Sequence, residues 1–169
     1  MTGPRVIRMK QVALRVVEIW WQKRILVESD ENDEYLVPKI DAESKSSANF
    51  YCIYGQHPVY GNNVLLYIGE TKRGGTGKRT IESRLREHFS GRFWDHTDLE
   101  ITIGLSEQKL TDEEICAVES ILIAAHKPAL NRKHIDGSTT NSKSFIVHNY
   151  GYIRSLASEC SGHYWASIT

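Results

Sequence analysis

The chain has 169 residues, which is enough for one domain with a single core and some elaborations. Hydrophobic residues make up 40% of it and charged residues 25%, the composition of an ordinary soluble globular protein. The formal net charge is zero, so the overall charge does not indicate a nucleic-acid-binding protein, and any such signal must lie in local patches.

Cysteine usage and hydropathy argue against secretion and membrane insertion. The three cysteines, Cys52, Cys116 and Cys160, are odd in number and too widely spaced for a disulfide framework or a zinc ribbon. No apolar signal segment follows the N-terminus. The uncharged stretch Phe50–Gly69 contains polar and turn-forming residues that a bilayer would not tolerate. We therefore expect a cytoplasmic protein with no membrane partner.

The first half of the chain predicts a hairpin after an ambiguous start. Val12–Val27 is rich in Val, Ile, Leu and Trp and fits either a strand or a helix. The polar run Asp41–Asn49 is typical of a loop or linker. Phe50–Tyr54 and Val64–Gly69 are rich in aromatic and branched residues, and Pro, Gly and Asn lie between them. This pattern predicts two strands joined by a turn.

Two helices and a further strand are expected after the hairpin. Thr80–Ser90 carries apolar residues at helical spacing, and Asp98–Leu105 alternates like a strand. Thr111 and Glu114 form a capping-box pattern at the start of a helix. That helix should end near His126, because a Lys-Pro pair follows it.

The element order β-β-α-β-α predicts an α/β (α+β) sandwich over residues 48–134, with a mostly antiparallel three-stranded sheet flanked by helices. Residues 1–47 would form an N-terminal extension. Residues 135–169 would form a C-terminal extension packed on the core, in which Phe145–Tyr152 is a strand or an irregular element.

Glu119 breaks the apolar pattern of its helix. At 100° per residue it lies about 40° from Ile115, between Leu122 and Ile123, where packing would favour an apolar residue. An unpaired carboxylate there costs several kcal/mol unless a cation or strong donors meet it. Glu119 is therefore either a buried partner of an arginine or a metal ligand that faces the sheet.

Arg84 and His88 are i, i+4 neighbours on the flank of the apolar face of the preceding helix. An arginine there suits the negative charge of a phosphoryl group, because its planar fork presents several donors. His88 is either a proton acceptor or phosphate ligand, or an ordinary packed residue. Arg86 points outward and suits solvent or a phosphate backbone.

The basic segment around residues 72–92 is a candidate contact for nucleic-acid backbone. Its glycine-rich loop is not a phosphate-binding P-loop, because that motif needs Ser or Thr where Arg79 follows Gly77-Lys78. The candidate backbone contacts are Lys72, Arg73, Lys78, Arg79 and Arg86.

Six of these positions, in order, resemble the signature of the GIY-YIG nuclease superfamily, and the chain is most similar to its type II restriction-endonuclease branch. The matching elements are Tyr51 in NFYCIY, Tyr67 in LLYIGET, Arg84 and His88 in SRLREH, Glu119 in AVESILI, and Asn131 in KPALNRK. The YIG element is literal, and the resemblance covers about residues 48–134.

The glycine of the GIY element is absent, and either Tyr51 or Tyr54 could be the first motif tyrosine. Strand alternation places Tyr51 and Ile53 on one face and Cys52 and Tyr54 on the other. The family's strand continues after the motif tyrosine, which favours Tyr51.

The resemblance implies that Glu119 holds one Mg²⁺, for which Mn²⁺ can substitute, and that Tyr51 acts as general base with Tyr67 beside it. A phenol with an ordinary pKa of about 10 is a weak base at neutral pH. We therefore expect positive charge from Arg84, His88 and the metal to lower this pKa. Arg84 would bind the phosphorane, and Asn131 would anchor the site by hydrogen bonding.

The expected function is that of a metal-dependent endonuclease acting on double-stranded DNA, of the sequence-specific restriction type. The two extensions would supply target recognition or homodimerisation. The alternatives are a repair, recombination or mobile-element nuclease, and a non-catalytic nucleic-acid-binding module on the same scaffold.

Overall fold

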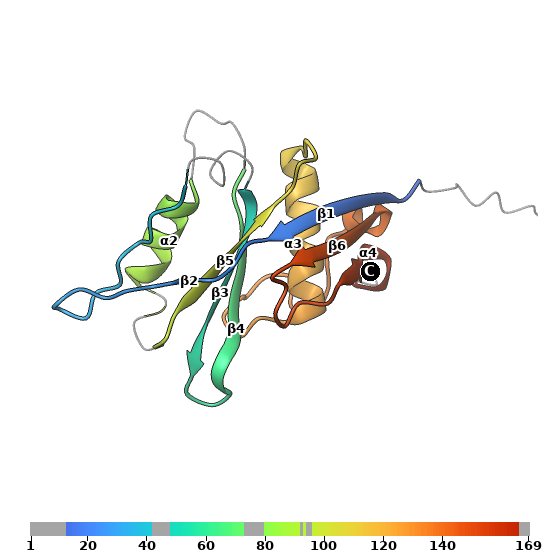
Figure 1. Cartoon of the computed structure of the whole chain (residues 1–169). Coiled ribbons are helices and arrows are strands. Elements are labelled where there is room, and N and C mark those ends of the chain that lie inside the picture. Colours follow the sequence, from blue (N-terminus) through green and yellow to red (C-terminus); the bar gives the residue numbers. More distant parts are fainter. Residues whose placement is uncertain (1–12, 42–47, 73–79, 92, 94–95, 166–169) are drawn as a thin grey trace, which may run out of the picture.

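The structure is a computed structural model that describes residues 13–41, 48–72, 80–91, 93 and 96–165. It is a mixed α and β fold in which one sheet separates two helices (Figure 1). The strands are β1 (Arg15–Trp21), β2 (Ile25–Leu26), β3 (Ala48–His57), β4 (Gly61–Glu70), β5 (Glu100–Leu105), β6 (Phe145–Gly151) and β7 (Glu159–Ser161). The helices are α2 (Ile81–Phe89), α3 (Asp112–His126), the 3₁₀ helix η1 (Thr140–Ser144) and α4 (Gly162–Trp165).

Over the described residues, the sheet has seven strands, in the order β4-β3-β5-β1-β6-β7 with β2 paired to β5. The expectation of a three-stranded sheet was therefore wrong. Both extensions add strands to the central ones: β1 pairs antiparallel with β5, and β6 pairs parallel with β1 from Arg15↔Phe145 to Trp21↔Gly151. These pairings join segments more than 80 residues apart, and local sequence pattern does not reveal such partners.

The ambiguous N-terminal segment contains the strand β1. Its side chains alternate between buried and exposed, with Val17, Ile19 and Trp21 buried in the core. This period of two matches a strand with one covered face. The tail segment expected to be a strand or irregular is the strand β6, whose Phe145 and Val147 lie in the same core.

The expected hairpin and helices are present between the extensions. Strands β3 and β4 pair antiparallel, and β5 pairs with the other side of β3. Helix α2 begins after Thr80, whose side chain accepts a hydrogen bond from the Ser83 N–H. Helix α3 begins with the predicted capping box of Thr111 and Glu114 and ends at Lys127, which has a left-handed backbone.

The two helices cover opposite faces of the sheet (Figure 1). Helix α2 packs Ile81, Leu85 and Phe89 against the face that carries Tyr51 and Ile53. Helix α3 packs its apolar side against the face that carries Phe50, Cys52 and Tyr54. In β3, residues 51 and 53 therefore face α2, and residues 50, 52 and 54 face α3. Among the residues described here, no helix is long and apolar enough to cross a membrane.

Candidate functional site

Four of the residues singled out by the sequence, Tyr67, Arg84, Glu119 and Asn131, line a cavity of about 340 Å³ at the outer edge of strand β4. Four segments far apart in the sequence form its wall: the end of β4, the first half of α2, the middle of α3, and the loop after α3. The polar and aromatic lining residues are Tyr67, Glu70, Arg84, Glu119, Asn131, Arg132, Lys133 and His134.

Tyr51 and Tyr67 lie side by side on the α2 face of the sheet, with ring centroids 6.1 Å apart. His88 completes the cluster: its Nε2 is 2.9 Å from the Tyr51 hydroxyl, and its ring centroid is 4.4 Å from that of Tyr67. Tyr67 is 8% exposed and lines the cavity, whereas Tyr51 is 0% exposed. Tyr51 is therefore more deeply buried than Tyr67 and does not line the cavity.

The glycine of the YIG element is explained by Tyr51. Gly69 is the cross-strand partner of Tyr51. A Cβ added at Gly69 would lie 2.8 Å from Cε1 of Tyr51 and closer still to its Cζ and hydroxyl oxygen. Only a residue without a side chain leaves room for this ring, because atoms this close overlap.

Tyr54 lies on the opposite face and does not join this cluster. It packs in the core beneath α3, and the guanidinium of Arg154 lies 4.2 Å from its ring centroid. Of the two candidates for the first motif tyrosine, the geometry therefore places Tyr51 with Tyr67 and His88 and leaves Tyr54 out.

The pKa of Tyr51 is raised above its ordinary value of 10, chiefly because burial disfavours the phenolate and because Tyr67 adds to this effect. Arg84 hydrogen-bonds the Tyr51 hydroxyl and lowers the pKa, but by less than burial raises it. Arg84 thus acts on this phenol in the expected direction, but without a metal its charge does not bring the pKa below the ordinary value. Burial dominates because the phenolate would lose the solvation of its charge in the core.

Glu119 lies in the cavity with its pKa raised from 4.5 to about 7, first by burial and then by repulsion from Glu70. Arg84, Lys72 and Lys133 oppose this rise. The carboxylate is therefore harder to ionise than an ordinary glutamate, and the nearby cations do not fully offset this effect. A divalent cation would relieve this repulsion between two carboxylates.

Glu70 is a site residue that the sequence analysis missed. It ends strand β4 and has the same parity as Ile68, which faces α3. That parity was a usable signal, because a carboxylate facing the helix that carries Glu119 is unusual on a core face. The run NRKH after the second helix likewise signalled the cavity residues Arg132 and Lys133.

The carboxylates of Glu70 and Glu119 suit Mg²⁺, which binds through one or two carboxylates, retained waters and substrate phosphates. Within the described part of the chain there is no group of three or more His, Cys, Asp and Glu side chains that could hold a metal ion. A site of two carboxylates thus fits a substrate-assisted Mg²⁺ ion better than an all-protein cage.

Asn131 fixes the loop after α3 to the edge of the sheet. Its Oδ1 accepts a hydrogen bond from the Ile68 N–H at 2.9 Å, and its Nδ2 donates to the Ile68 carbonyl at 2.9 Å. The backbone N–H groups of Ala129 and Leu130 also donate to the Leu65 and Leu66 carbonyls. Asn131 thus takes the place of a neighbouring strand beside Tyr67.

The residues expected to contact a nucleic-acid backbone are not all found at this site. Lys72 contacts Cys116 and acts on Glu119, so it lies at the site. Arg86 is exposed, as expected, but lines a different cavity with Asp33 and Glu34. Arg73, Lys78 and Arg79 lie outside the described residues.

Some of the hydrogen-bond donors of the Arg84 side chain are already used within the protein. Its Nη1 donates to Glu87 at 2.9 Å, and its side chain is about one-fifth exposed. The remaining donors face Tyr51 and the cavity. An arginine in this position can donate hydrogen bonds to a phosphate in the cavity while it keeps its contact with Glu87.

Comparison of the chain with family models, with curated proteins and with solved structures found no match.

Proposed function

We propose that the chain is a divalent-metal-dependent nuclease that hydrolyses phosphodiester bonds in DNA, of the GIY-YIG type. The observation that carries the proposal is the cavity at the edge of β4. It brings Tyr67, Arg84, Glu119 and Asn131 together from segments that span more than 60 residues. Carboxylates, a guanidinium and a phenol around a polar cavity are groups that phosphodiester hydrolysis can use.

Glu119, with Glu70 beside it, would hold Mg²⁺ or Mn²⁺. When bound, the cation would neutralise charge at the scissile phosphate and on the leaving oxygen. Arg84 presents its free donors to the non-bridging phosphate oxygens, whose negative charge grows during the reaction. The cations Lys72, Lys133 and Arg132 hold the neighbouring phosphates at the rim.

The phenol that meets the attacking water is Tyr67, because it lines the cavity while Tyr51 is fully buried. Tyr51 is a positioning residue: its hydroxyl holds His88 at 2.9 Å, and His88 in turn packs against Tyr67. The ring of His88, held by this hydrogen bond, packs against Tyr67 and orients its phenol toward the cavity. This assigns the contact with the attacking water to the second motif tyrosine rather than the first.

Within this class we favour a sequence-specific, restriction-type endonuclease on double-stranded DNA, because the motif spacing from the hairpin through SRLREH is most similar to that branch. Target recognition and pairing of two copies would then fall to segments 1–47 and 135–169.

Cleavage by the purified protein tests this proposal. Genomic DNA, supercoiled plasmid, single-stranded DNA and RNA are incubated with Mg²⁺, Mn²⁺ or a chelator. Wild-type protein is compared with Glu119→Gln, which keeps the shape and removes the charge. Glu113→Gln is the matched control, because it changes an exposed carboxylate on the same helix. We expect metal-dependent cleavage by the wild type and the control, and loss of at least 100-fold in Glu119→Gln.

The products distinguish the alternatives. Discrete genomic fragments support a restriction-type enzyme, and cleavage confined to branched or mobile-element substrates supports a structure-specific nuclease. Tight DNA binding without cleavage under any metal would leave a non-catalytic binding module on the same scaffold. The proposal would be refuted if the protein bound none of the substrates and cleaved none of them.

A further inference from the structure

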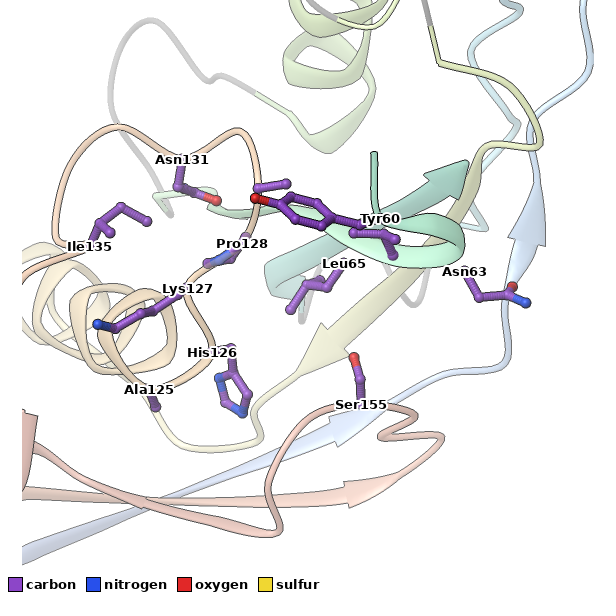
Figure 2. Close-up of a pocket in the computed structure, with 12 residues that line it drawn as sticks. Tyr60, Asn63, Leu65, Ala125, His126, Lys127, Pro128, Asn131, Ile135 and Ser155 are labelled. Carbon is purple, nitrogen blue, oxygen red and sulfur yellow. The ribbon is translucent and has the colours of Figure 1, made fainter. Parts of the chain in front are cut away.

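A second and larger cavity, of about 710 Å³, is shown in Figure 2. Asn131 lines both cavities. Tyr60, from the turn between β3 and β4, lies over the second cavity with its ring directed toward Asn131 (Figure 2). Lys127, the C-cap residue of α3, also lines this cavity.

The two cavities follow one strand. Asn63 and Leu65 of β4 line the second cavity, and Tyr67 and Glu70 of the same strand line the first. At about 3.3 Å per residue, the stretch from 63 to 70 covers about 23 Å. One strand of a DNA duplex advances about 3.4 Å per nucleotide, so this length matches about seven nucleotides. The two cavities thus follow one another along β4, and Asn131 belongs to the lining of both.

The lining of the second cavity has the chemistry of a nucleic-acid contact. Tyr60 is 69% exposed, and one ring face is already stacked on His57 at 4.5 Å. An exposed phenol of this kind offers a surface on which a nucleobase can stack. Lys127 supplies a cation for a phosphate. As far as the described residues go, no Asp or Glu belongs to this lining, so nothing there repels phosphate.

The far wall of the cavity is held rigidly. His126 Nδ1 lies 2.7 Å from the Leu122 carbonyl, and its Nε2 accepts the Ala157 N–H at 2.8 Å. The backbone partners on both ring nitrogens fix the neutral tautomer, and burial lowers the pKa of this imidazole. The loop that carries Ser155 is thereby tied to the end of α3.

We propose that this second cavity binds the DNA strand adjacent to the cleaved phosphate, with a base against Tyr60 and a phosphate at Lys127. The proposal rests on the nuclease function proposed above and adds the path of the substrate strand to it.

Steady-state cleavage by point variants tests this path. Tyr60→Ala and Lys127→Gln are compared with Tyr164→Ala and Lys143→Gln, which change an exposed tyrosine and an exposed lysine outside both cavities. After the wild-type cleavage position is mapped, KM and kcat are measured on long duplexes and on duplexes trimmed stepwise on either side. Thermal unfolding of each variant checks that it is folded.

We expect Tyr60→Ala to raise KM about tenfold on long duplexes with kcat unchanged, as the loss of one stacked base predicts. Lys127→Gln should raise KM and reduce the slope of log KM against log salt by about one, as the loss of one phosphate contact predicts. Both effects should vanish when the duplex is trimmed on the side that lies in the second cavity, and should persist when it is trimmed on the other side. The control variants should match the wild type.

Wild-type cleavage with KM unchanged in both cavity variants would overturn the strand path and leave the nuclease standing. Equal effects on trimmed and long duplexes would overturn it as well. A wild type that cleaves nothing would instead overturn the nuclease, and the strand path with it.

Discussion

Replacing Glu119 by Gln should stabilise the metal-free protein at alkaline pH. The reason is the energetic position of this carboxylate, whose pKa is raised from 4.5 to about 7 by burial and by the nearby Glu70. Above pH 7 the folded protein must hold a charge that the unfolded chain holds more easily. A neutral amide of the same shape removes that penalty.

The magnitude follows from proton linkage. Between pH 4.5 and about 7, the folded state binds the Glu119 proton more tightly than the unfolded state, so raising the pH through this window lowers the free energy of unfolding. Below the window Glu119 is protonated in both states and contributes no difference. Above it the full difference between the two pKa values applies, which corresponds to about 3 kcal/mol.

Urea unfolding of the wild type, Glu119→Gln and Glu107→Gln at intervals from pH 4 to 9 measures this difference. Glu107 is an exposed carboxylate in the loop after β5 and serves as the control. We expect Glu119→Gln to gain stability over the wild type as pH rises, reaching about 3 kcal/mol by pH 8. Addition of Mg²⁺ or Mn²⁺ should stabilise the wild type and leave Glu119→Gln unchanged. A gain that does not depend on pH would refute the reasoning, and so would a loss of stability at pH 8.

Two further changes test the geometry around the site. Gly69→Ala should destabilise the protein by about 1–3 kcal/mol in urea unfolding, because its Cβ would overlap the buried Tyr51 ring. Gly91→Ala, where a Cβ meets nothing within 4 Å, should stay within about 0.5 kcal/mol of the wild type, and equal values for the two would contradict the overlap. Asn131→Asp should destabilise by about 1–3 kcal/mol above pH 5, because a carboxylate cannot donate to the Ile68 carbonyl. A pH-independent melting temperature equal to that of the wild type would show that the Asn131 clamp contributes nothing.

The elements with local signals could be predicted from the sequence. The capping box of Thr111 and Glu114 sets where α3 begins, and the Lys-Pro pair sets where it ends. The extent of the sheet could not be predicted, because Trp21 pairs with Gly151 and Trp20 with Leu105 across long stretches of chain. Such pairings depend on the whole fold, and the residues themselves fit other partners equally well.

The site shows the same division between local and non-local causes. Helical phase was enough to mark Glu119 as out of place, and strand parity was enough to separate Tyr51 from Tyr54. The raised pKa of Tyr51 was missed because it comes from burial under α2, which neighbouring residues do not reveal. Strand parity also pointed to Glu70, but the inference requires knowing that α3 covers that face of β4.

The position of the site on an edge strand accounts for the role of Asn131. A free sheet edge presents unpaired N–H and C=O groups that invite pairing with other chains. At β4 the Asn131 amide and the backbone of Ala129 and Leu130 occupy this edge without adding a full strand. The edge is thereby capped by a narrow segment, and cavities remain open on both sides of it. The same segment therefore satisfies backbone groups of the β4 edge and contributes Asn131 to the lining of both cavities.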